Sequence, residues 1–196
     1  MLGEHNVQNC LAALSICIEM GISEAAIRKG LEQFKGVGRR FDFKGMVNGI
    51  TVIDDYGHHP VEIKASLSAG RMRCPDGKLI AVVQPHRYTR LRDLFEDFCA
   101  CFNDADDVLV ADVYAAGEAP INGFEKADLV AGLHAYGHRN AAVLSSPEAL
   151  ADEILARASS GDLVMCLGAG TITNWAGTLP NELALKTGHP VEGDGA

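Results

Sequence analysis

The chain has 196 residues, 47% of them hydrophobic and 22% charged, which are the proportions of a folded globular protein. Its 26 acidic residues against 17 basic ones give a net charge of −9, which argues against binding nucleic acid through a basic face. No apolar run reaches the roughly 18 residues that cross a bilayer, and the N-terminus lacks the pattern of a signal peptide, so we expect no membrane association.

The first 38 residues predict two helices. Residues 6–20 place apolar side chains on one face and stop before Gly21, which suits the backbone that closes a helix. Ser23 fits the N-cap of a second helix, which we expect to end at Lys35-Gly36. Two short helices bury too little surface to fold alone. Residues 1–38 are therefore interpreted as the end of a domain whose remainder lies outside this chain.

A hairpin and an α/β pattern follow. Asn48-Gly49 suits the two left-handed positions of a type I′ turn between strands at 41–47 and 50–54. Beyond it, short apolar runs, typical of strands buried on both faces, alternate with helical stretches. The expected strands are Ile50–Asp54, Leu79–Val83, Val108–Asp112, Ala141–Leu144 and Leu163–Leu167, and the expected helices run roughly over 60–72, 90–103, 124–136 and 147–158. We predict an open, mostly parallel α/β sheet with flanking helices, and a polar, Gly-rich, disordered tail at 187–196.

The six cysteines form no Cys-x-x-Cys pair, and most of them lie inside apolar runs. They are Cys10, Cys17, Cys74, Cys99, Cys101 and Cys166. This pattern predicts reduced, buried thiols in a cytoplasmic protein.

Polar side chains follow four of the expected strands, at the edge where open α/β sheets bind ligands. The segments are Asp54–Pro60, Gln84–Arg90, Asp112–Glu118 and Gly168–Thr171. Arg87 and Arg90 lie three apart on the first turn of a helix, where cations oppose the helix dipole, and their forked groups suit a carboxylate or phosphate. We therefore favour an anion site there over ordinary surface charge.

The other polar segments keep more than one interpretation. Asp54 or Asp55 could simply cap the helix that Pro60 opens. The turn Gly168-Ala169-Gly170 could cradle an anion at a helix N-terminus, or it could only allow tight packing of strand and helix. Asn6 and Asn9 share a helix face and offer the donor and acceptor that match adenine, although Asn6 could equally be an N-cap.

A metal site is the competing interpretation of the same edge, with nitrogen and oxygen ligands for Zn²⁺ or Mn²⁺. Its members would be His58, His59, His86, Asp55, Asp112 and Glu118. Adjacent histidines in an extended segment point to opposite sides, so a chelate using both would need a special turn. We expect no metal ligand set in this chain.

Five motifs in order resemble the Mur ligase family over about residues 2–185. They are GEHNVQN at 3–9, GRRF at 38–41, DDYGHHP at 54–60, QPHRYTR at 84–90 and DVYAAGE at 112–118. The resemblance implies three domains, for a UDP-sugar, for ATP, and a Rossmann-like C-terminal domain. Residues 1–38 would then be the helical end of the central ATP-binding domain, and residues 39–186 the C-terminal ligase domain.

The implied reaction is ATP-dependent amide formation in peptidoglycan precursor synthesis, as in the family member that joins L-alanine to UDP-N-acetylmuramate. By motif, Asn6 and Asn9 would contact adenine, Asp55 the ribose, and Arg40 the transferring phosphoryl group. The amino-acid site would be shaped by further residues that the motifs supply. These are Tyr56, His58, His86, Arg87 and Arg90, with His58 as a conceivable proton acceptor.

The chain carries no P-loop, because its one Gly-Lys pair, Gly77-Lys78, is followed by Leu79 rather than Ser or Thr. The resemblance implies that the P-loop, the Mg²⁺ ligands and the UDP-binding domain lie upstream. We therefore expect a C-terminal portion of the enzyme that is inactive alone. Alternatives are a metal-dependent hydrolase, a non-catalytic binding module, and a related ligase that takes a murein tripeptide.

Overall fold

The computed structural model describes residues 4–34 and 37–193. The chain divides into two compact units, Met1–Gly38 and Arg39–Ala196, and each is described by itself below. None of the helices in these described ranges is both long enough and apolar enough to cross a bilayer.

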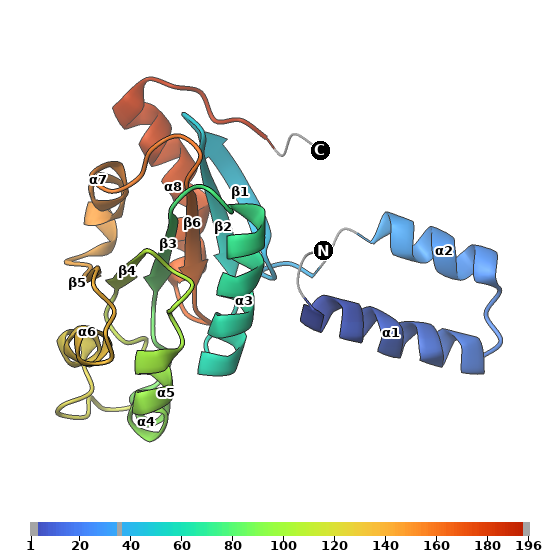
Figure 1. Ribbon diagram of the computed structural model, residues 1–196, viewed down its shortest axis with the longest axis horizontal. Coiled ribbons are helices and arrows are strands. Elements are labelled where there is room, and N and C mark those ends of the chain that lie inside the picture. Colours follow the sequence, from blue (N-terminus) through green and yellow to red (C-terminus); the bar gives the residue numbers. More distant parts are fainter. Residues whose placement is uncertain (1–3, 35–36, 194–196) are drawn as a thin grey trace. The chain divides into compact units, whose positions relative to one another are not determined.

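The first unit consists of the two predicted helices, α1 (Glu4–Glu19) and α2 (Glu24–Gln33) (Figure 1). Gly21 between them has a φ of 71°, and the Ser23 hydroxyl accepts a hydrogen bond from the Ala26 amide at 3.4 Å, as expected for an N-cap. No apolar side chain described in this unit is buried. The two helices therefore present apolar surface without a core of their own.

The second unit begins with the predicted hairpin, β1 (Asp42–Val47) and β2 (Ile50–Asp55). Asn48 and Gly49 have φ values of 50° and 75°, the left-handed pair that a type I′ turn requires. An alanine at position 49 would also bring its Cβ within 2.1 Å of the Ser160 hydroxyl oxygen. Both the positive φ and this close contact therefore require glycine at position 49.

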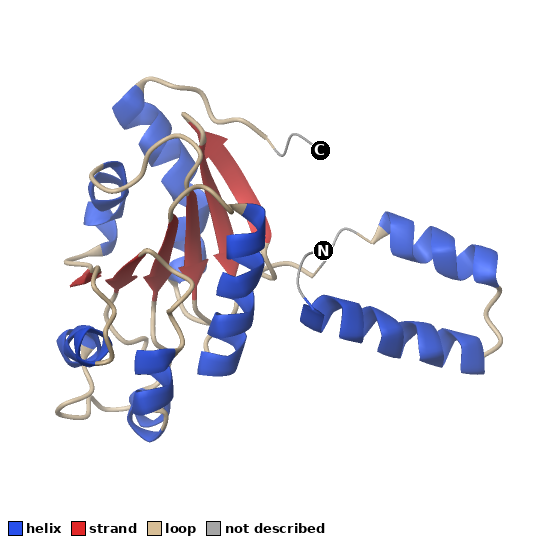
Figure 2. Ribbon diagram, in the orientation of Figure 1, coloured by secondary structure: helices blue, strands red, loops and turns tan. Residues whose placement is uncertain are grey.

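Six strands form one sheet in the order β1-β2-β6-β3-β4-β5, in which only β1 is antiparallel to its neighbour (Figure 2). The remaining strands are β3 (Leu79–Val83), β4 (Asp107–Val110), β5 (Ala141–Val143) and β6 (Leu163–Leu167). Every residue of β3 and β6 is buried. The predicted α/β sheet is confirmed. Its last strand in the chain, β6, lies between β2 and β3, which come much earlier in the sequence.

Helices cover both faces of the sheet (Figure 1). One face carries α3 (Pro60–Arg73), α4 (Tyr88–Asp93), α5 (Phe95–Ala100) and α6 (Lys126–Ala135). The other carries the short 3₁₀ helix η1 (Pro147–Ala149), α7 (Leu150–Leu155) and α8 (Ile172–Thr187). Chain segments leaving β2 and β3 turn to one face and the segment leaving β6 turns to the other. The switch point at which such sheets bind ligands therefore lies around the end of β6.

Two predicted helices are divided, and the tail differs from the prediction. The helix expected at 147–158 consists of η1 and α7 and ends at Leu155. The helix expected at 90–103 is broken at Leu94, whose φ of −120° separates α4 from α5. The tail expected to be disordered from residue 187 instead returns beside β1, where Met46 and Glu192 exchange hydrogen bonds of 3.0 and 2.8 Å. Polar composition did not reveal this pairing because backbone groups form it; residues 194–196 lie outside the described residues.

None of the six cysteines, all of which lie in the described residues, is in a disulfide. Cys74, Cys99, Cys101 and Cys166 are buried, as predicted, whereas Cys10 and Cys17 in α1 are half-buried. Burial, together with the charge of Glu96, raises the pKa of the Cys99 thiol to about 11, so this sulfur is a core atom rather than a nucleophile.

Candidate functional site

The segments that follow β2, β3 and β4 meet at one edge of the sheet in the second unit. Their aromatic rings form a chain in which Tyr56 and His58 have centroids 5.1 Å apart, His58 and His86 5.7 Å, and His86 and Tyr114 5.3 Å. His86 and Tyr114 are also joined by the backbone, because the Arg87 amide donates to the Tyr114 carbonyl at 2.9 Å. The fold therefore brings together the three motifs that the sequence placed after these strands.

Asp55 ends β2 and is only 3% exposed. One carboxylate oxygen accepts from the Phe41 amide at 2.8 Å, and the other accepts from the Gly57 amide and the Ser66 hydroxyl, each at 2.8 Å. These bonds fasten the start of the hairpin to the loop that carries Tyr56. In this structure Asp55 holds the site together, and a ligand hydroxyl would have to compete with three protein donors.

Arg39 is a site residue that sequence analysis did not distinguish from its neighbour Arg40. Its φ is 61°, and this backbone conformation directs the side chain inward, where Nη2 donates to the Gly168 carbonyl at 2.6 Å. Its Nε lies 3.5 Å from the carboxylate of Asp54, whose side chain is completely buried. The guanidinium also stands 4.8 Å above the Tyr56 ring, so one cation fixes the ends of β2 and β6 and the position of an aromatic ring.

Arg40, by contrast, turns outward, and its side chain is 42% exposed. Its Nη2 lies 3.5 Å from an oxygen of Glu62, and its guanidinium is 5.7 Å from the centre of the Tyr56 ring. An arginine that is half in water and loosely paired can exchange its carboxylate partner for a phosphoryl group at little cost.

His58 has a defined tautomer. Its Nδ1 lies 2.9 Å from the Tyr56 carbonyl and 3.3 Å from a carboxylate oxygen of Glu62, and both of these partners can only accept. Nδ1 therefore carries the hydrogen, which leaves Nε2 as a proton acceptor when the ring is neutral.

His86 has the opposite tautomer. Arg90 donates through Nη1 to the His86 carbonyl at 3.0 Å and to its Nδ1 at 3.2 Å, so Nδ1 accepts and Nε2 carries the hydrogen. Burial lowers the pKa of His86, and the positive charges of Arg90, His58 and Arg87 lower it further. The site thus faces a ligand with one imidazole acceptor and one imidazole donor.

Arg87 and Glu118 form an exposed ion pair of 3.4 Å at the start of α4. Glu118 also accepts from the Thr89 amide at 3.0 Å and its hydroxyl at 2.7 Å, and these hydrogen bonds hold the pKa of Glu118 below its usual value. The predicted pair of free arginines is thus partly neutralised: Arg90 is bonded to His86, and Arg87 has a carboxylate partner that a ligand anion would displace.

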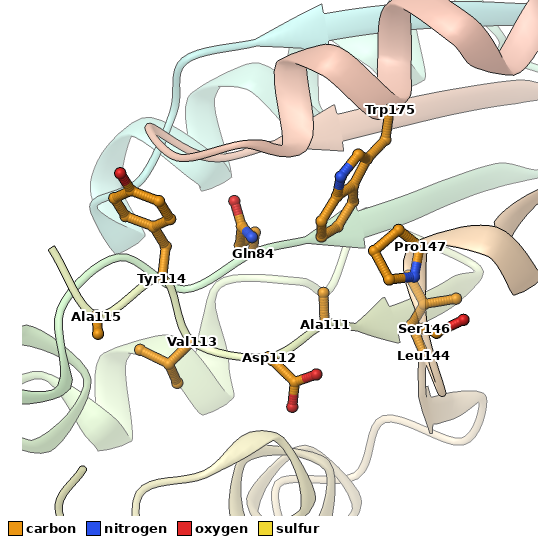
Figure 3. Close-up of a pocket in the computed structure, with 10 residues that line it drawn as sticks. All are labelled: Gln84, Ala111, Asp112, Val113, Tyr114, Ala115, Leu144, Ser146, Pro147 and Trp175. Carbon is orange, nitrogen blue, oxygen red and sulfur yellow. The ribbon is translucent and has the colours of Figure 1, made fainter. Parts of the chain in front are cut away.

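The Gly168-Ala169-Gly170 turn packs tightly rather than cradling an anion. The Gln84 side chain occupies the position that an anion would take at the N-terminus of α8. Its Oε1 accepts a hydrogen bond from the Ile172 amide at 3.1 Å. A Cβ on Gly170 would approach Gln84 Oε1 to 2.4 Å and Tyr114 Cγ to 2.7 Å. A pocket of about 230 Å³ opens beside this contact, with Tyr114 and Trp175 on either side of Gln84 (Figure 3).

The structure does not support the metal-site interpretation. Within residues 4–34 and 37–193, no three His, Cys, Asp or Glu side chains are placed to hold a metal ion together. Asp55 is occupied by protein donors, Glu118 caps α4, and the His59 ring accepts from the Val61 amide at 3.3 Å as the N-cap of α3. Asp112 pairs with Lys126 at 3.0 Å, so it too has a partner outside any shared metal site.

Asn6 and Asn9 lie in α1 of the other unit, where Asn6 is buried and Asn9 is exposed. Gly3 of the same motif is outside the described residues. The adenine contact predicted for these two asparagines stays a prediction.

Comparison with known proteins gives a consistent result. A family profile described as "Mur ligase, glutamate ligase domain" matches residues 39–170. A UDP-N-acetylmuramate–L-alanine ligase from Phenylobacterium zucineum (strain HLK1) is 62% identical over 183 residues, which are 93% of this chain and 38% of that protein. The chain spans about two fifths of the length of the curated relatives that it matches.

Solved structures share the fold. A UDP-N-acetylmuramate–alanine ligase from Thermotoga maritima has a TM-score of 0.78 and 26% identity, covering 95% of this chain and 39% of that one. A MurF ligase from the same organism, solved in complex with ADP, has a TM-score of 0.67 and covers 94% of this chain and 39% of that one. Its identity of 20% shows a common fold alone.

Proposed function

This chain belongs to the Mur ligase family, as its motifs predict, and from that premise we propose that it supplies the amino-acid side of an ATP-dependent ligase that joins L-alanine to UDP-N-acetylmuramate. The 62% identity to a relative named for this reaction supports alanine, although the family description mentions glutamate. The observation that carries the proposal is the paired imidazoles of His58 and His86, flanked by Arg40, Arg87 and Arg90, at one sheet edge.

The reaction needs an activated carboxyl group, because a carboxylate is a poor electrophile. In the first step a carboxylate oxygen of UDP-N-acetylmuramate attacks the γ-phosphorus of ATP, and ADP leaves with the electron pair of the broken P–O bond. In the second step the alanine nitrogen attacks the acyl carbon, the C–N bond forms, and phosphate leaves. The nitrogen loses a proton, and Nε2 of His58 is proposed to accept it, because Nδ1 is occupied by the Tyr56 carbonyl.

Arg40 is proposed to meet the phosphoryl charge, since it is half-exposed and only loosely paired with Glu62. Arg87 and Arg90 are proposed to bind the alanine carboxylate, Arg90 while it also holds the ring and carbonyl of His86. Tyr56 is proposed to line the same site, kept in place by the Arg39 cation above it. Asp55 is proposed to reach the ribose by exchanging one of its three donors.

The nucleotide is proposed to be ATP with Mg²⁺, and a ligase of the same fold was solved with ADP. The described residues offer no cluster of metal ligands, so the Mg²⁺ ligands are proposed to lie in the parts of the enzyme that this chain does not include. Asn6 and Asn9 are proposed to contact adenine. We propose a cytoplasmic location for the enzyme, because free thiols persist in that compartment.

The proposal is tested with a ligase of full family length that carries this chain. Phosphate release should require ATP, UDP-N-acetylmuramate and L-alanine together, and mass spectrometry should show the alanine amide as product. Replacement of alanine by the tripeptide L-alanyl-γ-D-glutamyl-diaminopimelate should abolish turnover. Efficient use of the tripeptide in place of alanine would instead assign the chain to the tripeptide ligases.

A further inference from the structure

One carboxylate connects the two sides of the candidate site. Glu62 lies in the first turn of α3, and one of its oxygens accepts from the backbone amides of His58 at 3.1 Å and His59 at 3.3 Å. The same oxygen lies 3.3 Å from Nδ1 of His58. Its other oxygen lies 3.5 Å from Arg40. Two oxygens of one side chain therefore face the group proposed to accept the amine proton and the group proposed to meet the phosphoryl charge.

Glu62 is charged in this position. Its partial burial alone would raise its pKa, but the hydrogen bonds from the His58 and His59 amides, and the positive charges of Arg40 and of His58 when that ring is protonated, lower the pKa overall. An ionised carboxylate can only accept, so it fixes the hydrogen of His58 on Nδ1 together with the Tyr56 carbonyl. In the neutral ring, Nε2 is thereby left without a hydrogen and can accept a proton.

We infer that Glu62 is a positioning residue that sets the spacing between Arg40 and His58 and holds His58 in the tautomer that accepts a proton. This inference rests on the proposed function. It goes beyond helix capping, because a cap needs only the two backbone contacts, whereas Glu62 also faces an imidazole and a guanidinium.

Asp128 provides a matched control. It occupies the same first-turn position in α6, where its carboxylate accepts from the Glu125 amide at 2.8 Å in the same type of capping box. None of the contacts described for Asp128 reaches a residue of the candidate site. Glu62→Gln and Asp128→Asn therefore remove the same charge from equivalent caps, and only the first touches His58 and Arg40.

In the ligase of full family length, Glu62→Gln should lower kcat about tenfold, part of the roughly 10²–10⁴ that a positioned proton acceptor contributes. Asp128→Asn should change kcat less than about twofold. In a His58→Gln background, Glu62→Gln should have little further effect on kcat, because the two residues act through one proton transfer. Equal losses in both backgrounds, or equal losses in the two cap variants, would show that Glu62 is only a helix cap.

A second measurement needs no turnover, so it separates this inference from the proposed function. Nitrogen-15 NMR of the His58 ring in this chain should show mainly the Nδ1–H tautomer, unchanged in Asp128→Asn and partly replaced by the Nε2–H tautomer in Glu62→Gln. An unchanged tautomer ratio in Glu62→Gln would overturn the inference even if alanine ligation is confirmed. A shifted ratio in a protein that does not ligate alanine would instead contradict the proposed function alone.

Discussion

Arg39 and Asp54 form an ion pair in which the carboxylate has no exposure to solvent and the arginine side chain is 27% exposed. The pair is incompletely satisfied, because Asp54 Oδ1 and Arg39 Nε have no hydrogen-bond partner. Asp54 Oδ2 accepts from the Thr173 hydroxyl at 2.6 Å, so the pair also connects β2 to α8. Lys44 lies 3.8 Å from the same Asp54 oxygen, so two cations offset the cost of burying this carboxylate, and Arg39 is the nearer of them.

Removal of Arg39 should therefore destabilise the chain strongly. Arg39→Met is expected to lower the free energy of unfolding by about 2–3 kcal/mol, because it removes the nearest cation from the buried Asp54 and leaves only Lys44, at 3.8 Å, as a counter-ion. Urea denaturation measures the loss. Arg92→Met is the matched control, since Arg92 pairs with Asp93 in an exposed bridge, and its loss should change the free energy of unfolding far less. Equal losses for the two variants would contradict a structural role for the Arg39–Asp54 pair.

Two glycines of neighbouring segments should respond oppositely to alanine. Gly170→Ala brings Cβ against Gln84 and Tyr114 and should lower the Tm, at a cost of about 1–3 kcal/mol. Gly177→Ala lies in α8 with open space around it, and should raise stability by up to about 1 kcal/mol through helix propensity. Thermal unfolding of both variants checks the prediction, and a stabilising Gly170→Ala would show that the turn after β6 is looser than described.

The pKa of the His86 ring should lie below its ordinary value of 6.5, because burial, the cations Arg90 and Arg87, and His58 when that ring is protonated all disfavour the charged form of His86. Proton NMR of the ring measures the midpoint directly. Arg90→Gln should move that midpoint upward, whereas Arg92→Gln, which is not among the groups acting on His86, should leave it in place.

The same shift makes stability depend on pH. Between the lowered pKa of folded His86 and the value of 6.5, the unfolded chain binds more protons than the folded one. The contribution of His86 is therefore fully present above pH 6.5 and is lost as the pH falls through the folded pKa. His86→Asn should flatten the decline of stability on this acid side in urea titrations, and an unchanged slope would contradict the prediction.

Arg90 and lysine should not be interchangeable in the ligase of full family length. Arg90→Lys is expected to raise the KM for L-alanine about tenfold, because an ammonium cannot hold His86 and a carboxylate with the geometry of a guanidinium. Arg92→Lys, on the same helix, should leave the KM for alanine unchanged. A loss in kcat with no change in KM would place Arg90 at the phosphoryl group instead.

This polypeptide by itself should release no phosphate from ATP, with or without alanine, because its sequence contains no P-loop. A phosphate-release assay on the purified chain tests this directly. Turnover that survives further purification would mean that the nucleotide chemistry does not depend on a P-loop.

The sequence predicted the strands well and their order not at all. Leu79–Val83 and Leu163–Leu167 coincide with the predictions because uninterrupted apolar runs mark strands buried on both faces. Which strands become neighbours depends on contacts between residues 112 positions apart for β2 and β6 and 84 positions apart for β3 and β6, so no local pattern indicates that β6 lies between β2 and β3.

The same distinction applies to the site. His58 and His86 could be found because they stand directly after strands, where polar residues indicate a ligand edge. The inward turn of Arg39 depends on a positive φ and on Asp54, and the capping of α8 by Gln84 spans 88 residues, so neither has a signal in sequence. Glu62 could have been noticed, since its spacing from His59 is that of a capping box.

The central place of β6 sets an order of events during synthesis. After β2 and β3 have left the ribosome, the position between them in the sheet is unfilled until residues 163–167 emerge, about eighty residues after β3. Both bordering strands then expose unpaired backbone groups, which is the state in which nascent sheets are most prone to aggregate. A chain that stops before β6 would thus lack the strand that joins β1-β2 to β3-β4-β5. It would form two separate half-sheets rather than a domain that lacks one edge strand.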